Sequence, residues 1–454
     1  MKEVLNFIDQ NKDQYLAELV EFLKIPSISS EEAYNESTYK AAEWLADNFR
    51  NAGIPEIKLY ETKGHPIVYA QDLTAGAGAP TILVYGHYDV QPVDPLDLWD
   101  SPPFEPVIKN GKIFARGTSD DKGQAFMHVK AYEAYKKIKG ALPVNVKYMI
   151  EGEEECGGDN LEEFIINNQE MLKCDTVMVS DTEWFADGMP SICYSLRGNV
   201  YLEITVTGPN RDLHSGTYGG GVDNPLNVLC WMISQLKDSD GRISIPGFYD
   251  NVLDLTEVER DAFKKLPFSE EEYCKDLDIN MTHGELGYTT LERVWARPTL
   301  DLNGIYGGYT GLGSKTVLPS KASAKFSMRI VPHQTSEEIA LKAKSYLEKL
   351  CPPTVKLSIK MLWGGNPVLM PIDSKSIKIA IESLKEAFGK DTVFMREGGS
   401  IPVVGLFDSV LKAPTVLMGM GLPGDNIHSP NESFSIENFY GGIKASALFI
   451  DKYK

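Results

Sequence analysis

The sequence predicts an α/β protein in which a small open-sheet domain is inserted into a larger domain. Three observations lead to this prediction. Short apolar runs typical of buried strands are separated by helical segments in the first part of the chain and return near its end. The middle of the chain instead alternates apolar and polar residues, as half-exposed strands do. With 454 residues, the chain is also too long for one ordinary domain.

The larger domain is predicted from apolar runs that have the length of buried strands. These runs are residues 81–86, 144–150, 176–180 and 415–418. Helices are expected at about 121–140 and 374–388, and the N-terminal segment has the pattern of one amphipathic helix that ends before Pro26. Because such strands are apolar on both sides, we expect helices to cover both faces of the sheet.

The smaller domain is predicted from the alternating segment 199–208, in which Val200, Leu202, Ile204 and Val206 share one face. The elements expected after it are a helix near 224–237, strands near 299–306 and 320–331, a helix opened by a capping box at 335–338, and a strand near 354–362. This β-α-β-β-α-β order describes a small open sheet with two helices on one face.

The strand near residue 415 returns to the pattern of the larger domain, so the smaller domain is an insertion. We therefore expect residues 1–197 and 366–454 to form the larger domain and residues 198–365 to form the inserted one. Residues 238–297 are a long polar stretch in which no pattern predicts a fold.

Composition narrows the possible partners and the compartment. The net charge of −19 argues against nucleic acid and membrane surfaces as partners. No apolar run approaches the ~20 residues that a membrane-spanning helix needs, and the N-terminus lacks the pattern of a signal peptide. The six cysteines are scattered and form no CxxC pair, so we expect single buried thiols in a reducing cytoplasm.

Acidic and imidazole side chains follow the ends of the predicted strands or open the next helix. They are His87 and Asp89, Asp120 and Asp121, Glu153 to Glu155, Asp181, and His428. In open α/β sheets, functional sites are built at the carboxyl ends of the strands. Taken alone, a histidine after a strand could be structural, the pair Asp120–Asp121 could cap a helix, and the glutamate run could be a solvated loop. Their joint placement favours one site.

The residue types in these groups suit a pair of divalent cations. Two imidazoles and three carboxylates match a borderline cation such as Zn²⁺ or Mn²⁺, and the sequence does not choose between the two. Such a ligand set holds two ions ~3.5–4 Å apart with a bridging carboxylate and a bridging water. Several carboxylates packed together would repel one another without cations, so the sequence predicts a two-metal hydrolase.

The motifs around these residues resemble the M20 family of co-catalytic metallopeptidases, above all its nonspecific dipeptidase and carnosinase branch. The resemblance covers nearly the whole chain. Its motifs are GHYDVQP (86–92), ARGTSDDKG (115–123), EGEEECGG (151–158), SDTEW (180–184), RDLHSGTYGG (211–220), KTVLPSK (315–321), REGGSIP (396–402) and NIHSPNE (426–432). The resemblance implies a catalytic domain with a mixed sheet and an inserted lid and dimerisation domain.

The resemblance also implies a role for each residue of the predicted metal site. His87 and Asp181 would bind one ion, Glu155 and His428 would bind the other, and Asp120 would bridge both, with a cis peptide between Asp120 and Asp121. Two further residues would assist the ligands. Asp89 would orient the His87 ring, and Glu154 would act as general base and then general acid.

The inserted domain would supply the remaining groups. His214 would reach the active site of a second subunit in a homodimer and stabilise the tetrahedral oxyanion. Arg329 would pair with the substrate carboxylate, and Thr316 would lie on the same lid strands. Gly399 and Ser400, in a Gly-Gly-Ser turn, would contact the same end of a small peptide substrate.

One position departs from the dipeptidases of this branch, and it leaves the substrate open. Where they carry His-Gly-Gly, this chain has Trp363 followed by two glycines. Trp363 either packs between lid and core or shapes a pocket for a bulkier side chain. Dipeptide hydrolysis is the leading hypothesis, and an N-acyl-amino-acid deacylase or desuccinylase is the alternative. A non-catalytic scaffold is disfavoured because every ligand and Glu154 are present.

Overall fold

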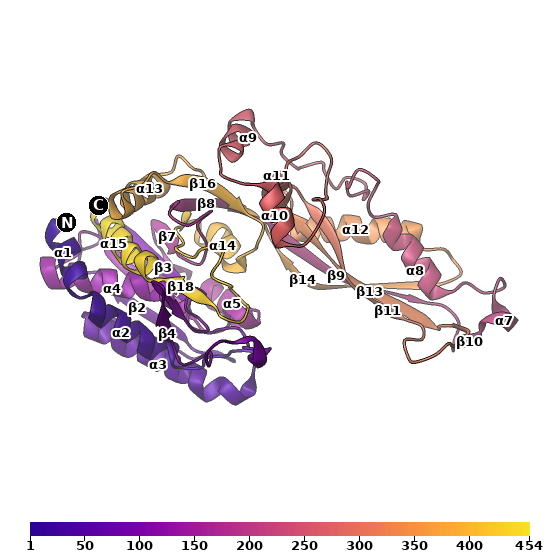
Figure 1. The fold of residues 1–454 in the computed structure, drawn as a ribbon, viewed down its shortest axis with the longest axis horizontal. Coiled ribbons are helices and arrows are strands. Elements are labelled where there is room, and N and C mark those ends of the chain that lie inside the picture. Colours follow the sequence, from indigo (N-terminus) through magenta and orange to yellow (C-terminus); the bar gives the residue numbers. More distant parts are fainter. The chain divides into compact units, whose positions relative to one another are not determined.

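The computed structural model describes residues 1–454, apart from the side chains of Asp159 and Pro402. The chain divides into two compact units (Figure 1). The first unit comprises Met1–Tyr194, Met370–Met395 and Leu406–Lys454, and the second comprises Ser195–Leu369 and Arg396–Gly405. The segment Arg396–Gly405 thus belongs to the second unit, whereas the boundaries drawn from the sequence leave it in the first.

The first unit is built on a mixed sheet, as predicted. Its strands lie in the order β1 (Glu56–Tyr60), β2 (Ile67–Asp72), β6 (Asn145–Glu151), β3 (Thr81–His87), β7 (Thr176–Val179), β17 (Thr415–Leu417) and β8 (Ser191–Leu196). The four central strands β6, β3, β7 and β17 are parallel, and the flanking pairs are antiparallel. These central strands are the four apolar runs of the sequence, and nearly all their residues are buried.

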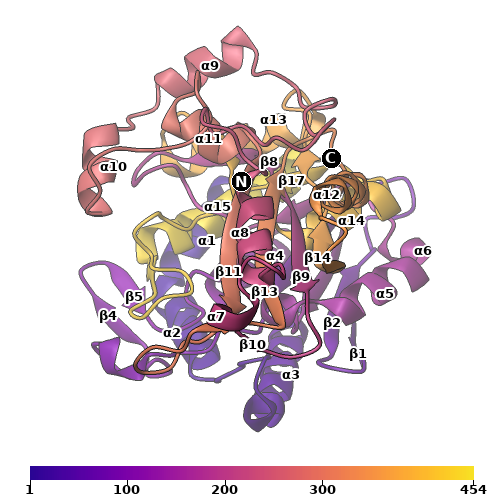
Figure 2. The ribbon, with the colours of Figure 1, turned by 90° about the vertical axis from the view of Figure 1, so that its right-hand side faces the viewer.

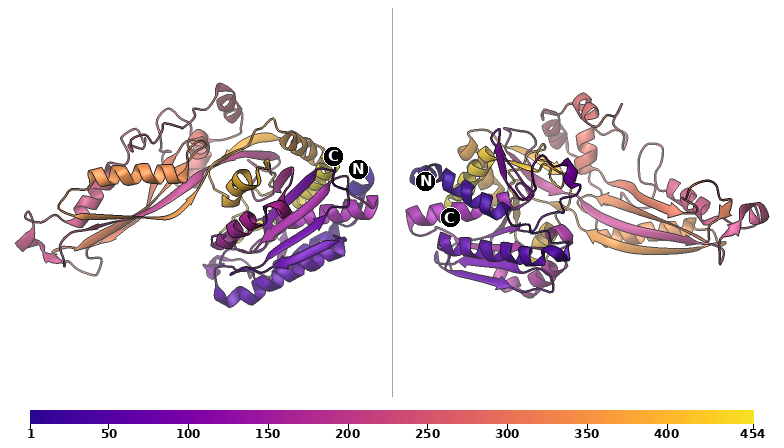
Figure 3. Two further views of the ribbon diagram at one scale, coloured as in Figure 1. Left: turned by 180° about the vertical axis from the view of Figure 1, so that it is seen from behind. Right: turned by 60° about the horizontal axis from the view of Figure 1, so that its bottom comes forward.

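Helices lie on either side of this sheet (Figure 3). The long helix α4 (Lys122–Lys139) packs on β3 and against α1 (Lys2–Gln10), α2 (Lys12–Leu23), α3 (Asn35–Ala52) and α15 (Ile436–Lys452). Helices α5 (Asp159–Asn167), α6 (Gln169–Leu172) and α13 (Lys375–Phe388) complete the unit. The prediction of one N-terminal helix is wrong, because the helix breaks at Asn11, whose side-chain amide donates to the Phe7 carbonyl at 2.7 Å.

The second unit contains a four-stranded antiparallel sheet in the order β11 (Thr299–Gly307), β13 (Lys321–Ile330), β9 (Gly198–Thr207) and β14 (Lys356–Gly365). Figure 2 shows these strands side by side. Helices α8 (Pro225–Ser234) and α12 (Ser336–Leu350) cover one face, where Val200, Leu202, Ile204 and Val206 are buried. The predicted β-α-β-β-α-β order is therefore confirmed.

The predicted capping box at the start of α12 is only half formed. Thr335 Oγ1 accepts a hydrogen bond from the Glu338 backbone N–H at 3.3 Å. The Glu338 carboxylate, however, lies 2.6 Å from Lys342 Nζ, one turn further along the helix. The side-chain ion pair thus replaces the return bond that would complete a capping box.

The polar stretch 238–297 folds into α9 (Glu257–Lys264), α10 (Glu270–Asp276) and α11 (Thr290–Ala296). Complete capping boxes open α9 at Thr256 and α11 at Thr289. A buried ion pair holds the end of the stretch, since Arg297 donates to both carboxylate oxygens of Glu285 at 2.8 Å. Apolar residues of the stretch also contribute, since Ile243, Ile245 and Phe248 join the core of the second unit, but they are scattered and form no periodic pattern.

Two predictions about membranes and cysteines can be compared with the structure. Among the described residues, no helix has the length and apolar character needed to cross a membrane. Cys193 is buried, but Cys156 and Cys230 are exposed. The prediction of buried thiols is therefore wrong for these two residues.

Candidate metal centre and carboxylate site

The predicted metal ligands come from the carboxyl ends of the parallel strands of the first unit. His87 ends β3, Asp181 lies two residues beyond β7, and Glu155 lies in a short 3₁₀ helix after β6. Asp120 precedes α4, and His428 lies in the loop between β17 and β18 (Ser433–Ser435). Because neighbouring parallel strands end at the same edge of a sheet, the five side chains meet there.

The five residues form two groups that share one carboxylate. His87, Asp120 and Asp181 form one group, and Asp120, Glu155 and His428 form the other. In each group, one possible ligand atom per residue lies within 4.8 Å of the others. Asp120 can therefore contribute an oxygen to each of two neighbouring cations.

The distances around Asp120 show how the two groups meet. Its Oδ1 lies 3.0 Å from His87 Nε2, and its Oδ2 lies 2.8 Å from His428 Nε2. His428 Nε2 is also 3.3 Å from Glu155 Oε2, and His87 Nε2 is 3.9 Å from Asp181 Oδ2. Both imidazoles thus present Nε2 to the shared carboxylate. The peptide between Asp120 and Asp121 is cis, as the family resemblance predicts.

Asp89 contacts the other nitrogen of the His87 ring. His87 Nδ1 lies 3.1 Å from the Asp89 backbone oxygen and 3.3 Å from its Oδ1. The Asp89 carboxylate is itself fixed, since Oδ2 accepts from Ser29 Oγ at 2.6 Å and from the Glu155 backbone N–H at 3.1 Å. A proton on Nδ1 leaves the Nε2 lone pair free for a cation, which is the arrangement seen around metal-bound histidines.

A buried carboxylate that the sequence analysis overlooked holds the Asp120 loop. Glu432 is fully buried and accepts from Arg116 Nη1 and from the backbone N–H groups of Gly117 and Ser119, each at 2.9 Å. It also accepts from the Asp120 N–H at 3.1 Å. The motif NIHSPNE therefore supplies both His428 and the group that positions Asp120.

The electrostatics of the cluster fit divalent cations. Burial raises the pKa of Glu155, and hydrogen bonds to Asp120 and Glu155 raise the pKa of His428 to about 10. Glu155 Oε1 is buried and has no hydrogen-bond partner among the described residues. Without cations, the concentrated negative charge of the cluster thus favours the protonated forms of Glu155 and His428. Two imidazole nitrogens and three carboxylates are donors that Zn²⁺ and Mn²⁺ accept, and such cations would take the place of these protons.

Glu154 stands beside the ligands with an unusually basic carboxylate. Burial raises its pKa well above the usual range, His87 opposes the rise, and the carboxylates of Asp181 and Glu155 add to it. A general base works best when its pKa lies near the working pH. A glutamate of ordinary acidity would be a weaker base, so this environment suits Glu154 to accept a proton.

The second unit contains a separate cluster made of cationic and neutral groups. Arg329, near the end of β13, donates from Nη1 to Ser400 Oγ at 2.9 Å. Ser400 Oγ donates in turn to the Arg197 backbone oxygen at 2.5 Å, and the Arg197 N–H donates to the Gly399 oxygen at 3.1 Å. The predicted residues Arg329, Gly399 and Ser400 thus lie together, and Arg197 is a member that the sequence analysis missed.

Of the other predicted residues of the second unit, His214 and Trp363 lie on its strands, whereas Thr316 directly precedes a strand instead of lying on one. His214 ends the short strand β10 (Leu213–His214), which pairs with β12 (Val317–Leu318), and the Ser215 N–H donates to the Thr316 oxygen at 3.0 Å. His214 is exposed. Trp363 is half-buried in β14, opposite Tyr201 of β9. His214 and Thr316 are therefore neighbours on one edge of the unit.

The sequence matches the family described as Peptidase family M20/M25/M40 over residues 83–452. The chain belongs to this family. It is thus an enzyme, a metallopeptidase, and the family uses divalent metal ions.

Relatives of this M20 peptidase match it along its whole length. The Cys-Gly metallodipeptidase dug1 of Schizosaccharomyces pombe is 33% identical, with 99% of this chain and 98% of the relative covered. The human Beta-Ala-His dipeptidase is 30% identical, with 99% and 92% covered. Among solved structures, the M20 family metallo-carboxypeptidase Sso-CP2 of Sulfolobus solfataricus is 37% identical, with a TM-score of 0.85 and 97% and 99% covered.

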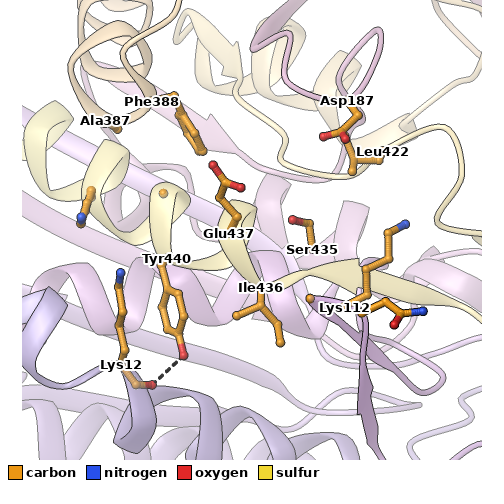
Figure 4. Close-up of a pocket in the computed structure, with 14 residues that line it drawn as sticks. Lys12, Lys112, Asp187, Ala387, Phe388, Leu422, Ser435, Ile436, Glu437 and Tyr440 are labelled. Carbon is orange, nitrogen blue, oxygen red and sulfur yellow. Dashed lines mark hydrogen bonds between the residues drawn. The ribbon is translucent and has the colours of Figure 1, made fainter.

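The M20 peptidase also has a cavity of about 620 Å³ elsewhere in its first unit (Figure 4). Its lysines are already paired, because Lys12 and Lys444 lie 3.0 and 2.7 Å from Asp9, and Lys112 lies 2.8 Å from Asp425. None of the predicted site residues lines it. The candidate site is therefore the ligand cluster around Asp120, called the metal cluster below, and not this cavity.

Proposed function

We propose that this peptidase hydrolyses the amide bond of dipeptides with the help of two divalent cations, Zn²⁺ or Mn²⁺. The observation that carries the proposal is the pair of ligand groups that share Asp120. His87 and Asp181 would hold one cation, and Glu155 and His428 the other. When bound, the cations supply Lewis-acid chemistry, which polarises the scissile carbonyl and acidifies a water molecule.

Glu154 then moves the proton that hydrolysis requires. Its carboxylate takes a proton from the attacking water and passes it to the leaving amine, so one residue serves as base and then as acid. The burial that raises its pKa supports this role. Asp89 holds the His87 ring through Nδ1 and keeps Nε2 directed at the cation site.

A free substrate carboxylate is the feature that Arg329 would recognise. Among the described residues, neither Arg329 nor Arg197 lies within ion-pair distance of a carboxylate, and their bonded partners are neutral oxygens. A guanidinium–carboxylate bond is charge-assisted and geometrically selective. Two relatives are named for the dipeptides Cys-Gly and β-Ala-His. Both dipeptides are short and end in a carboxylate, which is consistent with this role of Arg329.

We further propose a homodimer, located in the cytoplasm, in which His214 of one chain completes the active site of the other. His214 is exposed in the second unit. Among the described residues, its ring makes one hydrogen-bond contact, at 3.3 Å from Thr217 Oγ1. Such a histidine can donate to the oxyanion that forms during amide hydrolysis. Thr316, its neighbour on the same edge, would face the same substrate.

A panel of substrates tests the proposal. We expect turnover of dipeptides to exceed that of N-acetyl and N-succinyl amino acids, which would be the substrates of a deacylase. The similarity to a solved metallo-carboxypeptidase adds a second candidate, the removal of the last residue from longer peptides. Tripeptides cleaved as fast as dipeptides would favour that candidate, and exclusive turnover of acylated amino acids would overturn the proposal.

A further inference from the structure

In the sequence, Arg197 lies between strands β8 and β9. None of the family motifs includes it. It precedes β9, and the whole residue is only 9% exposed. Its contacts all fall within the second unit, and they concentrate on the turn formed by Gly398, Gly399 and Ser400.

Arg197 holds this turn with its side chain and with both of its backbone polar groups. Its Nε donates to the Gly398 oxygen at 3.0 Å, and its backbone N–H donates to the Gly399 oxygen at 3.1 Å. Its backbone oxygen accepts the Ser400 hydroxyl proton at 2.5 Å. Three consecutive residues are thus fixed by one arginine, which leaves the turn little freedom to shift.

The guanidinium is anchored on its far side by the stretch 238–297. Its Nη1 donates to the Arg297 oxygen at 3.3 Å, and Arg297 is locked by its bidentate pair with Glu285. The fit leaves no room for a larger residue at Gly398, because a Cβ there would lie 2.8 Å from both Arg197 Nη2 and the Val294 oxygen. The arginine therefore links a rigid support to the turn.

The Ser400 hydroxyl couples the position of the 398–400 turn to the orientation of Arg329. A hydroxyl has one proton to donate, and Ser400 gives it to the Arg197 oxygen. Its oxygen can then only accept, and it accepts from Arg329 Nη1 at 2.9 Å. Ser400 thus fixes the orientation of the Arg329 guanidinium, whose other N–H groups have no hydrogen-bond partner among the described residues and can bind a ligand.

The charges of the cluster indicate what the ligand must be. Burial and the nearby charge of Arg329 lower the pKa of Arg197 to about 10, and burial lowers the pKa of Arg329, while the more distant charge of Asp301 opposes both shifts. Two neighbouring cations, the buried Arg197 and the half-buried Arg329, form no ion pair among the described residues, so a bound anion would stabilise them. A substrate carboxylate supplies that anion.

We propose that Arg197 is a positioning residue for substrate selection: it fixes the 398–400 turn so that Ser400 orients Arg329 toward the substrate carboxylate. The proposal rests on the proposed dipeptidase function and extends it from Arg329 to the residues behind it. Arg197 itself does not touch the substrate. Its effect is specific for substrates that carry a free carboxylate.

The test compares a dipeptide with its C-terminal amide, using the best dipeptide substrate of the panel. Arg197→Lys keeps the charge but cannot bond Gly398 and Arg297 together as a guanidinium does. We expect kcat/KM for the acid to fall about 10- to 100-fold, mainly through KM, while kcat/KM for the amide changes less than about threefold. Arg50→Lys, at an exposed arginine of α3 that pairs with Asp47, should leave the acid-to-amide ratio unchanged.

A second pair of variants keeps the test decisive if Arg197→Lys fails to fold, which thermal unfolding and metal content would reveal. Ser400→Ala removes the hydroxyl and should lower the acid-to-amide ratio by a similar factor, whereas Ser400→Thr keeps it and should stay near wild type. A general structural defect would instead lower both substrates equally, and this result would overturn the inference.

The outcomes separate this inference from the function on which it rests. If the wild type prefers the acid but folded Arg197→Lys retains the same preference, the positioning role is wrong and the dipeptidase proposal stands. If the wild type cleaves acid and amide equally, carboxylate recognition by Arg329 is wrong, and the role of Arg197 fails with it.

Discussion

The metal cluster of the first unit and the arginine cluster of the second unit are opposite in charge. The first gathers three carboxylates and two imidazoles around Asp120, and the second places Arg197 and Arg329 among neutral oxygens. In each cluster, groups of one charge are in excess, and a counter-charge supplied from outside would stabilise them. Cations would supply it in the first cluster, and a substrate carboxylate would supply it in the second.

The two clusters also differ in how the chain builds them. The ligands of the first lie at the ends of parallel strands and at the start of a helix, where backbone geometry places them. The second depends on the turn at residues 398–400, held against Arg197 by hydrogen bonds. Substitutions in the first cluster should therefore affect chemistry and metal binding, and those in the second should affect the choice of substrate.

The largest effect is expected at Glu154, because it separates metal binding from proton transfer within one cluster. Glu154→Gln keeps the size of the side chain and removes its basicity. We expect kcat to fall at least ~10²-fold with metal content nearly unchanged. Steady-state kinetics and metal analysis measure both. Glu153→Gln is the matched control, since Glu153 bonds Asn160 at 2.8 and 3.0 Å and should be dispensable. Wild-type turnover by Glu154→Gln would remove Glu154 from the mechanism.

The next effect concerns His214, which belongs to the second unit but is proposed to act on chemistry. Loss of one oxyanion donor typically lowers the rate ~10²–10³-fold, so His214→Ala should be nearly inactive while it retains its metal ions. If instead only KM for the acid rises, His214 belongs with the arginine cluster and not with the chemistry.

Mixing two inactive variants tests whether His214 acts across a dimer. His214→Ala and Glu154→Gln chains that exchange subunits would form about half mixed dimers, each with one intact site out of two. The recovered activity should be about one quarter of the wild-type value per site. If demonstrated exchange brings no recovery, His214 acts within its own chain or not at all.

A smaller effect is expected at Asp89, which touches a ligand and not a cation. Asp89→Asn would weaken its hold on His87 Nδ1, and loss of such a partner typically costs about 10- to 100-fold in metal affinity or activity. Metal titration of the variant measures it. The exposed Asp97 provides the control, because Asp97→Asn should bind metal as the wild type does. Equal affinities for Asp89→Asn and the wild type would contradict the orienting role.

The smallest effect is expected at Trp363, which sharpens the account of substrate choice. If the half-buried indole lines the substrate pocket, Trp363→His should shift the preference between bulky and small dipeptides about three- to tenfold. If the indole only packs against its neighbours, the preference will stay constant and the melting temperature will fall. Kinetics on two dipeptides and a thermal melt distinguish the two roles.

The fold of both units followed largely from local patterns in the sequence. The four central strands of the first unit were visible because they are mainly apolar, and β9 because it alternates. The flanking strands β1, β2 and β8 were missed, since β1 has no fully buried residue, and β2 and β8 carry polar residues within short buried runs. The stretch 238–297 was also missed, because contacts such as Arg297–Glu285 leave no periodic trace.

The metal cluster could be predicted for the same reason that it forms, namely that strand ends place ligands at one edge. Glu432 and Arg197 could not be predicted in this way. Glu432 acts through bonds to a loop more than three hundred residues earlier, and Arg197 acts through a turn about two hundred residues later. A buried charge whose partner is distant in the chain has no local signature, and only the fold brings the two together.

The measurement that tests the central claim most directly is metal content together with dipeptide turnover, before and after chelation. The account predicts about two Zn²⁺ or Mn²⁺ ions per chain, loss of activity when they are removed, and recovery when either metal is added back. His87→Ala and His428→Ala should each lower the number of bound ions. Full dipeptide turnover by metal-free protein would contradict the assignment of Asp120 as the carboxylate shared by two catalytic cations.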